Sequence, residues 1–226
     1  VVDDRFGLNA WVKLGGQVLV ALGAFAAGFH LDSMMGWPLP FALDVVASLL
    51  WFLAVINAFN LIDGMDGVAG GLATIAALAI TGQAVLTGNA GDGLIPLSLA
   101  ATCIAFLRYN FHPAKIFLGD GGSMLIGFAV AAFGVTFSAR STTVISLAIP
   151  LLAVGVPFFD TFLAIWRRSA RRVLRKDDSG RIFHPDADHL HHRLLRLGLS
   201  QRKVALLMYA LATAVVILGF VSLFLS

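Results

Sequence analysis

The polar residues that could do chemistry gather in four short segments of this 226-residue chain. Every one of the 13 acidic residues is Asp, and the segments combine these carboxylates with amide, imidazole and basic side chains. Carboxylate and amide oxygens that face basic groups suit a divalent cation and a phosphate ester held between them. The pattern therefore predicts phosphoryl transfer. The segments are VVDDRFGLNAWVKLGGQ at 1–17, NAFNLIDGMDG at 57–67, RYNFHPAKIFLGDGGS at 108–123 and HPDADHLHHRLLRLG at 184–198.

The second segment places Asn57, Asn60 and Asp63 at three-residue spacing, with Asp66 beside them. On a continuing helix such side chains share one face. Polar groups at the edge of a membrane are costly unless they are satisfied, so this face is a candidate functional site. The alternative is a helix end that is capped by Asn and Asp. That alternative accounts for one or two of these residues but not for all four.

The third segment sets Asp120 among three glycines. Glycines let the backbone approach a phosphate or a metal closely, and the helix start that follows offers N–H donors to an anion. Taken alone, this stretch also fits an ordinary turn.

The fourth segment brings three histidines next to arginines. Imidazole and guanidinium groups bind phosphate oxygens, so the segment is a candidate phosphate site. Structural zinc is the less favoured alternative, because the spacing lacks the usual zinc frameworks. Hard oxygen ligands without cysteine indicate Mg²⁺, with Mn²⁺ as the alternative.

The elements that must position these residues are membrane helices. The chain is 58% hydrophobic and 13% charged, with a mean hydropathy of +0.87. Its single cysteine excludes a disulfide within the chain. We expect an all-α, polytopic transmembrane bundle that forms one domain over residues 1–226. Seven stretches are long and apolar enough to span a bilayer: about 14–30, 41–57, 68–86, 92–108, 123–139, 143–165 and 203–225.

The basic residues predict which side of the membrane each loop faces. Alternating loops at about 1–13, 57–67, 108–122 and 166–203 contain fifteen of the 16 Lys and Arg residues, and Arg140 is the exception. The positive-inside rule makes these loops cytoplasmic. All four polar segments then fall on the cytoplasmic face of a plasma membrane.

These segments resemble the cytoplasmic motifs of the bacterial polyprenyl-phosphate N-acetylhexosamine-1-phosphate transferases, the superfamily that includes phospho-MurNAc-pentapeptide translocase. The resemblance implies that about three N-terminal spans of the family are lacking from this chain. The matching stretches occur in the family's order: DDRFGLNAWVKLGGQ, NAFNLIDGMDGVAGGLA, RYNFHPAKIFLGDGGSMLIG and DHLHHRLLRLGLS.

The resemblance implies an enzyme that transfers N-acetylhexosamine-1-phosphate from a UDP-N-acetylhexosamine to undecaprenyl phosphate. UMP is released and a lipid-pyrophosphate sugar is formed. This reaction is the first membrane step in the synthesis of a cell-envelope polysaccharide such as teichoic acid or lipopolysaccharide O-antigen. Leu190 separates His189 from His191, which favours GlcNAc-1-phosphate over the alternative, phospho-MurNAc-pentapeptide. A homodimer is compatible with the family, and nucleic acid is not an expected partner. A membrane transporter is the alternative from another class.

The resemblance also assigns roles to residues. The predicted metal ligands for Mg²⁺ are Asn60 and Asp120. The predicted catalytic residues are Asp3, Asp4, Lys13, Asp63, Asp66 and Asp120. The predicted substrate-binding residues are Asn57, Asn60, Asn110, His189, His191, His192 and Arg193.

Asp3 and Asp4 have two open interpretations. They could act as a base toward the lipid phosphate, or they could position it. A phosphate monoester has its second pKa near about 6 and is mostly dianionic at neutral pH, which favours positioning.

Overall fold

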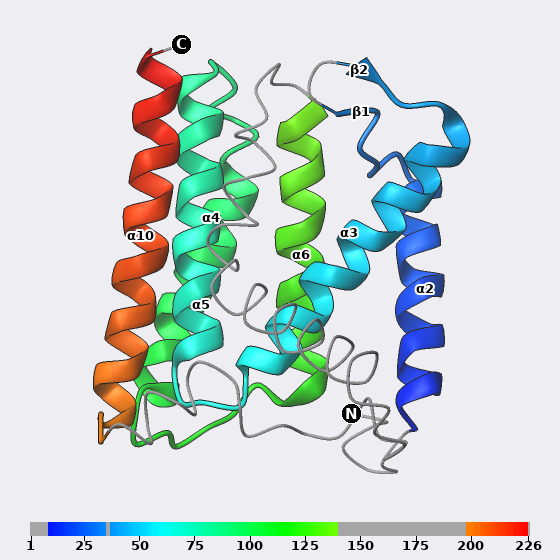
Figure 1. The fold of residues 1–226 in the computed structure, drawn as a ribbon. Coiled ribbons are helices and arrows are strands. Elements are labelled where there is room, and N and C mark those ends of the chain that lie inside the picture. The colour runs from blue at the N-terminus through cyan, green and yellow to red at the C-terminus, as the bar shows by residue number, and fades with distance from the viewer. Residues whose placement is uncertain (1–8, 35–36, 140–197, 226) are drawn as a thin grey trace, which may run out of the picture.

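The computed structural model describes residues 9–34, 37–139 and 198–225. The span expected at 143–165 and the histidine-rich segment lie outside these residues. The described part contains helices and one two-stranded hairpin (Figure 1). In chain order the elements are α2 (Ala10–Ala26), β1 (Ser33–Met34), β2 (Trp37–Pro38), α3 (Phe41–Ile62), α4 (Val68–Leu86), α5 (Leu94–Asn110), α6 (Gly119–Ala139) and α10 (Gln201–Leu225).

Four of the described helices, α3, α4, α6 and α10, are long and apolar enough to cross a membrane. The two others, α2 and α5, are apolar but have only 17 residues each. The prediction of a helical, multi-span membrane protein is confirmed for the described residues, with four candidate spans. The count of seven spans and the lack of N-terminal spans stay predictions.

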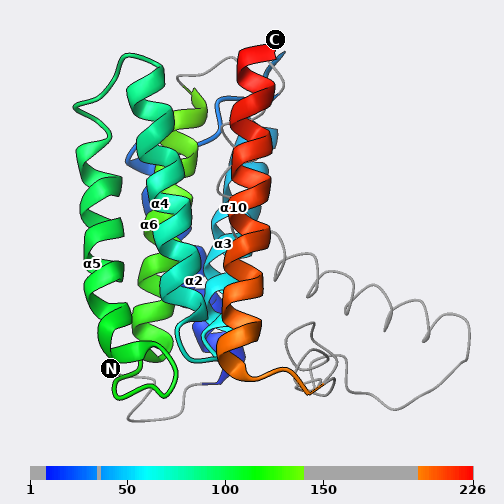
Figure 2. The ribbon, with the colours of Figure 1, turned by 90° about the vertical axis from the view of Figure 1, so that its left-hand side faces the viewer.

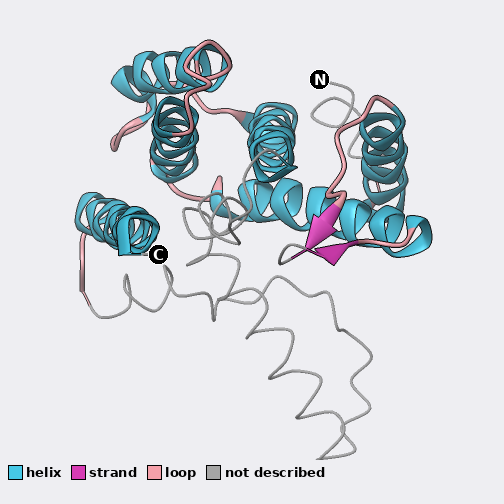
Figure 3. Ribbon diagram, turned by 90° about the horizontal axis from the view of Figure 1, so that it is seen from above, coloured by secondary structure: helices cyan, strands magenta, loops and turns pink. Residues whose placement is uncertain are grey.

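Helix α4 lies at the centre of the bundle. It packs against α5, α6 and α10, whereas α3 packs against α2 and α6. Of the most apolar stretch of α4, 72% is buried, compared with 28% for α10, so α10 presents most of its surface outward. Figures 1 and 2 show α4, α5, α6 and α10 running roughly side by side. Seen from above, α3 is strongly inclined to the other helices and lies beside α2 and α6 (Figure 3).

Glycine allows α3 and α6 to approach closely. A Cβ atom on Gly127 of α6 would lie 2.8 Å from Cα of Ile56 and 3.1 Å from the carbonyl oxygen of Val55, both on α3. Backbone atoms cannot give way as the end of a side chain can. The absence of a side chain at Gly127 therefore sets the distance between these two helices.

A polar network orders the connection between α2 and α3, at the end of the bundle where the hairpin lies. Nδ1 of His30 is 2.8 Å from Oδ2 of Asp44 in the first turn of α3. The other carboxylate oxygen of Asp44 accepts hydrogen bonds from the Leu31 N–H at 3.2 Å and the Ser48 hydroxyl at 2.9 Å. This network anchors the beginning of α3.

At the opposite end, the helices extend further than the sequence predicted. Helix α3 continues to Ile62, so the loop expected at 57–67 is reduced to residues 63–67. Similarly, α6 begins at Gly119, so the loop expected at 108–122 covers 111–118. The helices persist because their polar residues find partners on neighbouring helices.

Candidate active site

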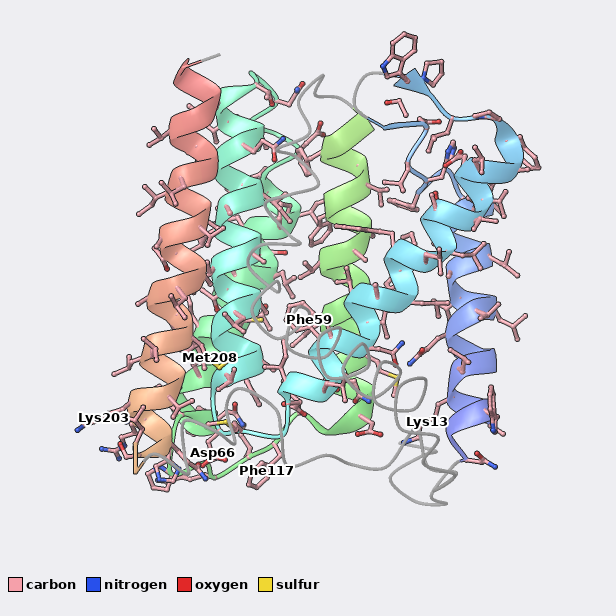
Figure 4. The ribbon with its side chains drawn as sticks, in the orientation of Figure 1. Lys13, Phe59, Asp66, Phe117, Lys203 and Met208 are labelled. Carbon is pink, nitrogen blue, oxygen red and sulfur yellow. The ribbon has the colours of Figure 1, made fainter. Side chains whose placement is uncertain are left out.

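One end of the bundle collects the charged residues and the loops that carry the sequence motifs. Figure 4 shows Lys13, Asp66, Phe117 and Lys203 at this same end. The starts of α2, α4, α6 and α10 and the ends of α3 and α5 all lie at this end (Figure 1). Residues from distant parts of the sequence are thereby brought together.

Lys13 and Asp120 form an ion pair across 107 residues of sequence. Nζ of Lys13, one turn into α2, lies 2.6 Å from Oδ2 of Asp120. Asp120 stands in the first turn of α6, directly after Gly119, whose φ of 64° is in the left-handed region. A carboxylate is favoured at this position by the positive end of the helix dipole. Both side chains are partly exposed, so they remain accessible to a ligand.

Asn60 is held by a serine one turn along α6 from Asp120. The buried Ser123 hydroxyl lies 3.0 Å from Oδ1 of Asn60 and 3.1 Å from the carbonyl oxygen of Gly119. The two predicted metal ligands, Asn60 and Asp120, are therefore linked through one turn of helix.

Asn57 and Gln17 bind each other. Nδ2 of Asn57 donates to Oε1 of Gln17 at 2.8 Å, and Nε2 of Gln17 donates to Oδ1 of Asn57 at 3.3 Å. Nδ2 of Asn57 also donates to the Leu53 carbonyl at 2.7 Å. The Asn57 amide is thus engaged on both sides within the protein, and its predicted contact with substrate stays a prediction.

Asp63 ends α3 as its C-cap residue. The pKa of its carboxyl is raised to about 6, first by burial and then by the negative charge of Asp120. The two carboxylates are therefore close enough to repel each other. Such a pair is typical of a site that holds a cation or shares a proton.

Asp66 orders the loop at 111–118. Its Oδ2 atom is 2.7 Å from Nδ1 of His112 and accepts from the Ala114 N–H at 3.1 Å. The bond between His112 and Pro113, within this loop, is cis. Asp66 thus joins the two loops of the site, at residues 63–67 and 111–118.

Asn110, the last residue of α5, makes the second link between these loops. Its Oδ1 atom accepts from the Gly67 N–H at 3.0 Å, and its Nδ2 atom donates to the Ile116 carbonyl at 2.8 Å. Gly67 has a φ of 79°, and a Cβ atom there would lie 3.0 Å from the Phe111 ring. Glycine is therefore required at this turn. In the structure Asn110 organises the loops, and its role toward substrate stays a prediction.

Helix α10 contacts both loops. The Tyr209 hydroxyl donates to the Gly67 carbonyl at 2.5 Å, and Nε of Arg202 donates to the His112 carbonyl at 2.8 Å. The Tyr209 ring lies directly over Gly71 of α4, where a side chain would collide with it. The chain immediately before α10 contains the histidine-rich segment, so these contacts fix the point from which that segment departs.

Sequence reasoning missed several of these residues. A glutamine inside an apolar helix is itself a signal, because an unsatisfied amide is costly there, and it could have identified Gln17. Ser123, His112, Arg202 and Tyr209 carry no comparable signal. Some predicted site residues lie outside the described part of the chain: Asp3, Asp4, His189, His191, His192 and Arg193.

Comparison with protein families gives one match that covers more than half of the chain. The description of the matching family is "Glycosyl transferase family 4", and the match covers residues 1–138. These residues contain all the helices that build the described site except α10.

Curated relatives resemble nearly the whole chain. The Bacillus subtilis "Probable undecaprenyl-phosphate N-acetylglucosaminyl 1-phosphate transferase" is 38% identical over 92% of this chain and 58% of its own length. The Mycobacterium tuberculosis "Decaprenyl-phosphate N-acetylglucosaminephosphotransferase" is 40% identical over 92% of this chain and 56% of its own length. The Moorella thermoacetica "Phospho-N-acetylmuramoyl-pentapeptide-transferase" is 33% identical over 97% and 68%. The chain thus spans somewhat more than half the length of the first two relatives.

Proposed function

The chain belongs to glycosyl transferase family 4, and from this premise we propose that it transfers N-acetylhexosamine-1-phosphate from a UDP-sugar to undecaprenyl phosphate. GlcNAc-1-phosphate is the favoured group, because the Bacillus subtilis and Mycobacterium tuberculosis relatives, both named for N-acetylglucosamine, are 38% and 40% identical to the chain. The relative named for phospho-MurNAc-pentapeptide is 33% identical, which makes that substrate the second candidate.

The proposed reaction exchanges one phosphoanhydride bond for another. An oxygen of the lipid phosphate attacks the phosphorus that carries the sugar. The bond from that phosphorus to UMP breaks, and UMP leaves with the bonding electrons. The product is a lipid pyrophosphate with the sugar attached. Two anions meet in this step, so the site must offset negative charge.

The side chains present fit a magnesium ion. Asn60 and Asp120 would hold it, because both offer hard oxygen atoms. Asn60 on α3 contacts the Ser123 hydroxyl, which lies one helix turn from Asp120 on α6. The raised pKa of Asp63, caused by burial and by Asp120, marks a place where carboxylates are crowded. A bound Mg²⁺ supplies positive charge that stabilises the pyrophosphate and the departing UMP.

The protein's own residues bind and orient the two substrates. The Lys13 ammonium, already 2.6 Å from Asp120, offsets negative charge where the lipid phosphate and the donor meet. Asp63 is a half-buried carboxylate close enough to Asp120 for the two charges to interact. Asp66 and Asn110 hold the loops that would surround the nucleotide sugar. Asp3 and Asp4 are proposed to position the lipid phosphate, and the histidine-rich segment to bind the donor.

The observation that carries the proposal is the meeting of Lys13, Asn60, Asp63 and Asp120 at one end of the bundle. These groups come from α2, α3 and α6 and form one cluster of hard oxygen atoms beside an ammonium. A transporter would instead need polar groups at mid-membrane depth along a pathway.

Incorporation of radiolabelled UDP-GlcNAc into lipid tests the proposal. Membranes that carry the full-length protein are supplied with undecaprenyl phosphate, with Mg²⁺ or with a chelator. We expect labelled lipid with Mg²⁺ and none with the chelator. Asp120→Asn should lower kcat by at least about a hundredfold, because it removes charge stabilisation from the transition state.

Asp92→Asn is the matched control. Asp92 is an exposed aspartate in the connection between α4 and α5, at the end of the bundle opposite the site. Its substitution should leave activity near that of the wild type. Absence of labelled lipid from the wild-type protein would overturn the proposed function. Labelling of lipid from UDP-MurNAc-pentapeptide but not from UDP-GlcNAc would instead identify phospho-MurNAc-pentapeptide as the transferred group.

A further inference from the structure

Two polar contacts lie one helical turn apart between α2, α3 and α6. The first contact, nearer the loops of the site, is the ion pair of Lys13 with Asp120. The second contact, one helical turn deeper into the bundle, joins Gln17 to Asn57 and brings Nε2 of Gln17 to 3.5 Å from the Met124 sulfur. Lys13 and Gln17 are four residues apart on α2, so they share one face of that helix.

The second contact is partly buried. The exposed fraction of Gln17 is 7%, whereas Asn57 is half-buried. The two amides exchange two hydrogen bonds, and Nδ2 of Asn57 also donates to the Leu53 carbonyl. Burial of an unpaired amide is costly, so the Gln17 amide depends on this partner. The reciprocal pair is therefore a strong orienting contact between α2 and α3.

Apart from Gln17, the buried residues of α2 among the described ones are small. They are Ala21 and Ala24, and the helix packs mainly on α3. Large apolar side chains such as Trp11, Leu19 and Val20 point outward. Within the described part of the chain, positions Gly15, Gly16 and Gly23 have no neighbouring atom within 4 Å of where a Cβ would stand. Few large apolar contacts with described residues therefore define the rotation of α2 about its axis.

We propose that Gln17 is a positioning residue of the transferase site, acting through its amide pair with Asn57. The pair fixes the rotation of α2 about its axis and its position along that axis. It thereby places Lys13 on Asp120, one helical turn closer to the loops of the site. This inference rests on the proposed function. It also gives Asn57 a different role from the one that the sequence predicted, since Asn57 acts through Gln17 rather than on substrate.

Kinetics of Gln17→Ala in the full-length protein test the role. Loss of the pair frees α2 to rotate, and a shift of about 1 Å at a reacting group can cost on the order of a hundredfold in rate. We expect kcat to fall at least about tenfold while KM for UDP-GlcNAc stays within about twofold, since the donor-binding groups are untouched. Asn57→Ala should show the same split between kcat and KM. The double variant should be no slower than either single variant, because both remove one contact.

Gln83→Ala is the matched control for removal of a buried amide. Gln83 is 2% exposed on α4, near the end of the bundle opposite the site. Its loss is expected to lower Tm without lowering kcat. A Gln17→Ala variant whose kcat falls no more than that of Gln83→Ala overturns the positioning role.

A length swap separates positioning from folding. Gln17→Asn combined with Asn57→Gln keeps the total length of the pair, so it should recover most of the wild-type kcat, while Gln17→Asn alone should not. No recovery, or an effect on KM alone, overturns the proposal. If the wild type still produces labelled lipid, the proposed function stands even though the positioning role of Gln17 fails. Its absence from the wild type would end the function itself and the inference with it.

Discussion

At the scale of single residues, the site combines groups that repel each other. Burial raises the pKa of Asp63, and the negative charge of the nearby Asp120 raises it further. The Lys13 ammonium lies on Asp120 and offsets part of this charge. Evolution retains such an arrangement when the chemistry needs it, at the expense of stability. Removing the negative charge of Asp63 should then make the fold more stable.

Asp63→Asn tests this conflict. The native carboxyl has its pKa raised to about 6 from 3.8, so the folded state binds the proton more tightly than the unfolded state does. Wild-type stability therefore falls as the pH rises from about 4 to about 6 and is level above that. We expect the variant to have a higher Tm than the wild type at neutral pH and a similar Tm near pH 4, and to lose transferase activity. A Tm difference that does not change with pH would contradict this account.

Substitutions at Asn110 test the link between the two loops. Asn110→Ala leaves the Gly67 N–H and the Ile116 carbonyl without their partner, which should lower the free energy of unfolding by about 1–3 kcal/mol. Asn110→Asp can still accept from Gly67 but cannot donate to Ile116, and it places a negative charge against a carbonyl. We expect Asp to be at least as harmful as Ala. Thermal unfolding in detergent measures both, and wild-type stability in Asn110→Ala would refute the link.

At the scale of elements, the contact between α3 and α6 decides whether Asn60 reaches Ser123. These helices meet at Gly127, two turns below the site, where only a hydrogen fits against the α3 backbone. The same two helices carry Asn60, Asp120 and Ser123. A change in their separation is therefore transmitted to the predicted metal ligands.

Gly127→Ala should push α3 away from α6. Its Cβ would stand 2.8 Å from Cα of Ile56, so the helices must separate, at a cost of about 1–3 kcal/mol. We expect a lower Tm and a lower kcat. Gly23→Ala on α2 is the control, because no atom lies within 4 Å of its Cβ position, and it should leave both quantities near the wild-type values. Equal effects of the two substitutions would refute the close contact.

The helices were predictable from the sequence, and the contacts between helices were not. The roles of the predicted site residues stay predictions, and the structure shows only that several of them lie at one end of the bundle. Apolar stretches fix which segments are helical, and Asn60, Asp63 and Asp120 stand out as polar residues at the ends of such segments. The partners of these residues depend on how helices cross. Gln17 and Asn57 are 40 residues apart, and Tyr209 and Gly67 are 142 apart. No local sequence pattern indicates such pairs, so they could be identified only from the three-dimensional structure.

At the scale of the whole molecule, the two ends of the bundle differ in charge. Every Lys and Arg in the described residues lies at the site end, on or beside the starts of α2 and α10 and the loop after α5. The hairpin end holds His30, Asp32 and Asp44 instead. The positive-inside rule predicts that the site end faces the cytoplasm, and this orientation stays a prediction.

Cysteine labelling in intact cells tests this orientation. Trp37→Cys stands in the hairpin and Phe117→Cys in the loop at 111–118, and both positions are well exposed. A membrane-impermeant maleimide should label Trp37→Cys in intact cells and Phe117→Cys only after the membrane is opened. The native Cys103 is buried and provides the background. The reverse labelling pattern would place the site on the outer surface.

Helix α3 is tied down at both ends, through Asp44 near its start and through Asn60 near its finish. A helix that is long for a thin bilayer responds by tilting. Since α3 already lies obliquely and cannot slide freely at either end, a change in tilt must move Asn60 relative to Asp120. The acyl-chain length of the surrounding lipids should therefore affect the two residues that are proposed to hold Mg²⁺, and transferase turnover should pass through an optimum as hydrophobic thickness is varied.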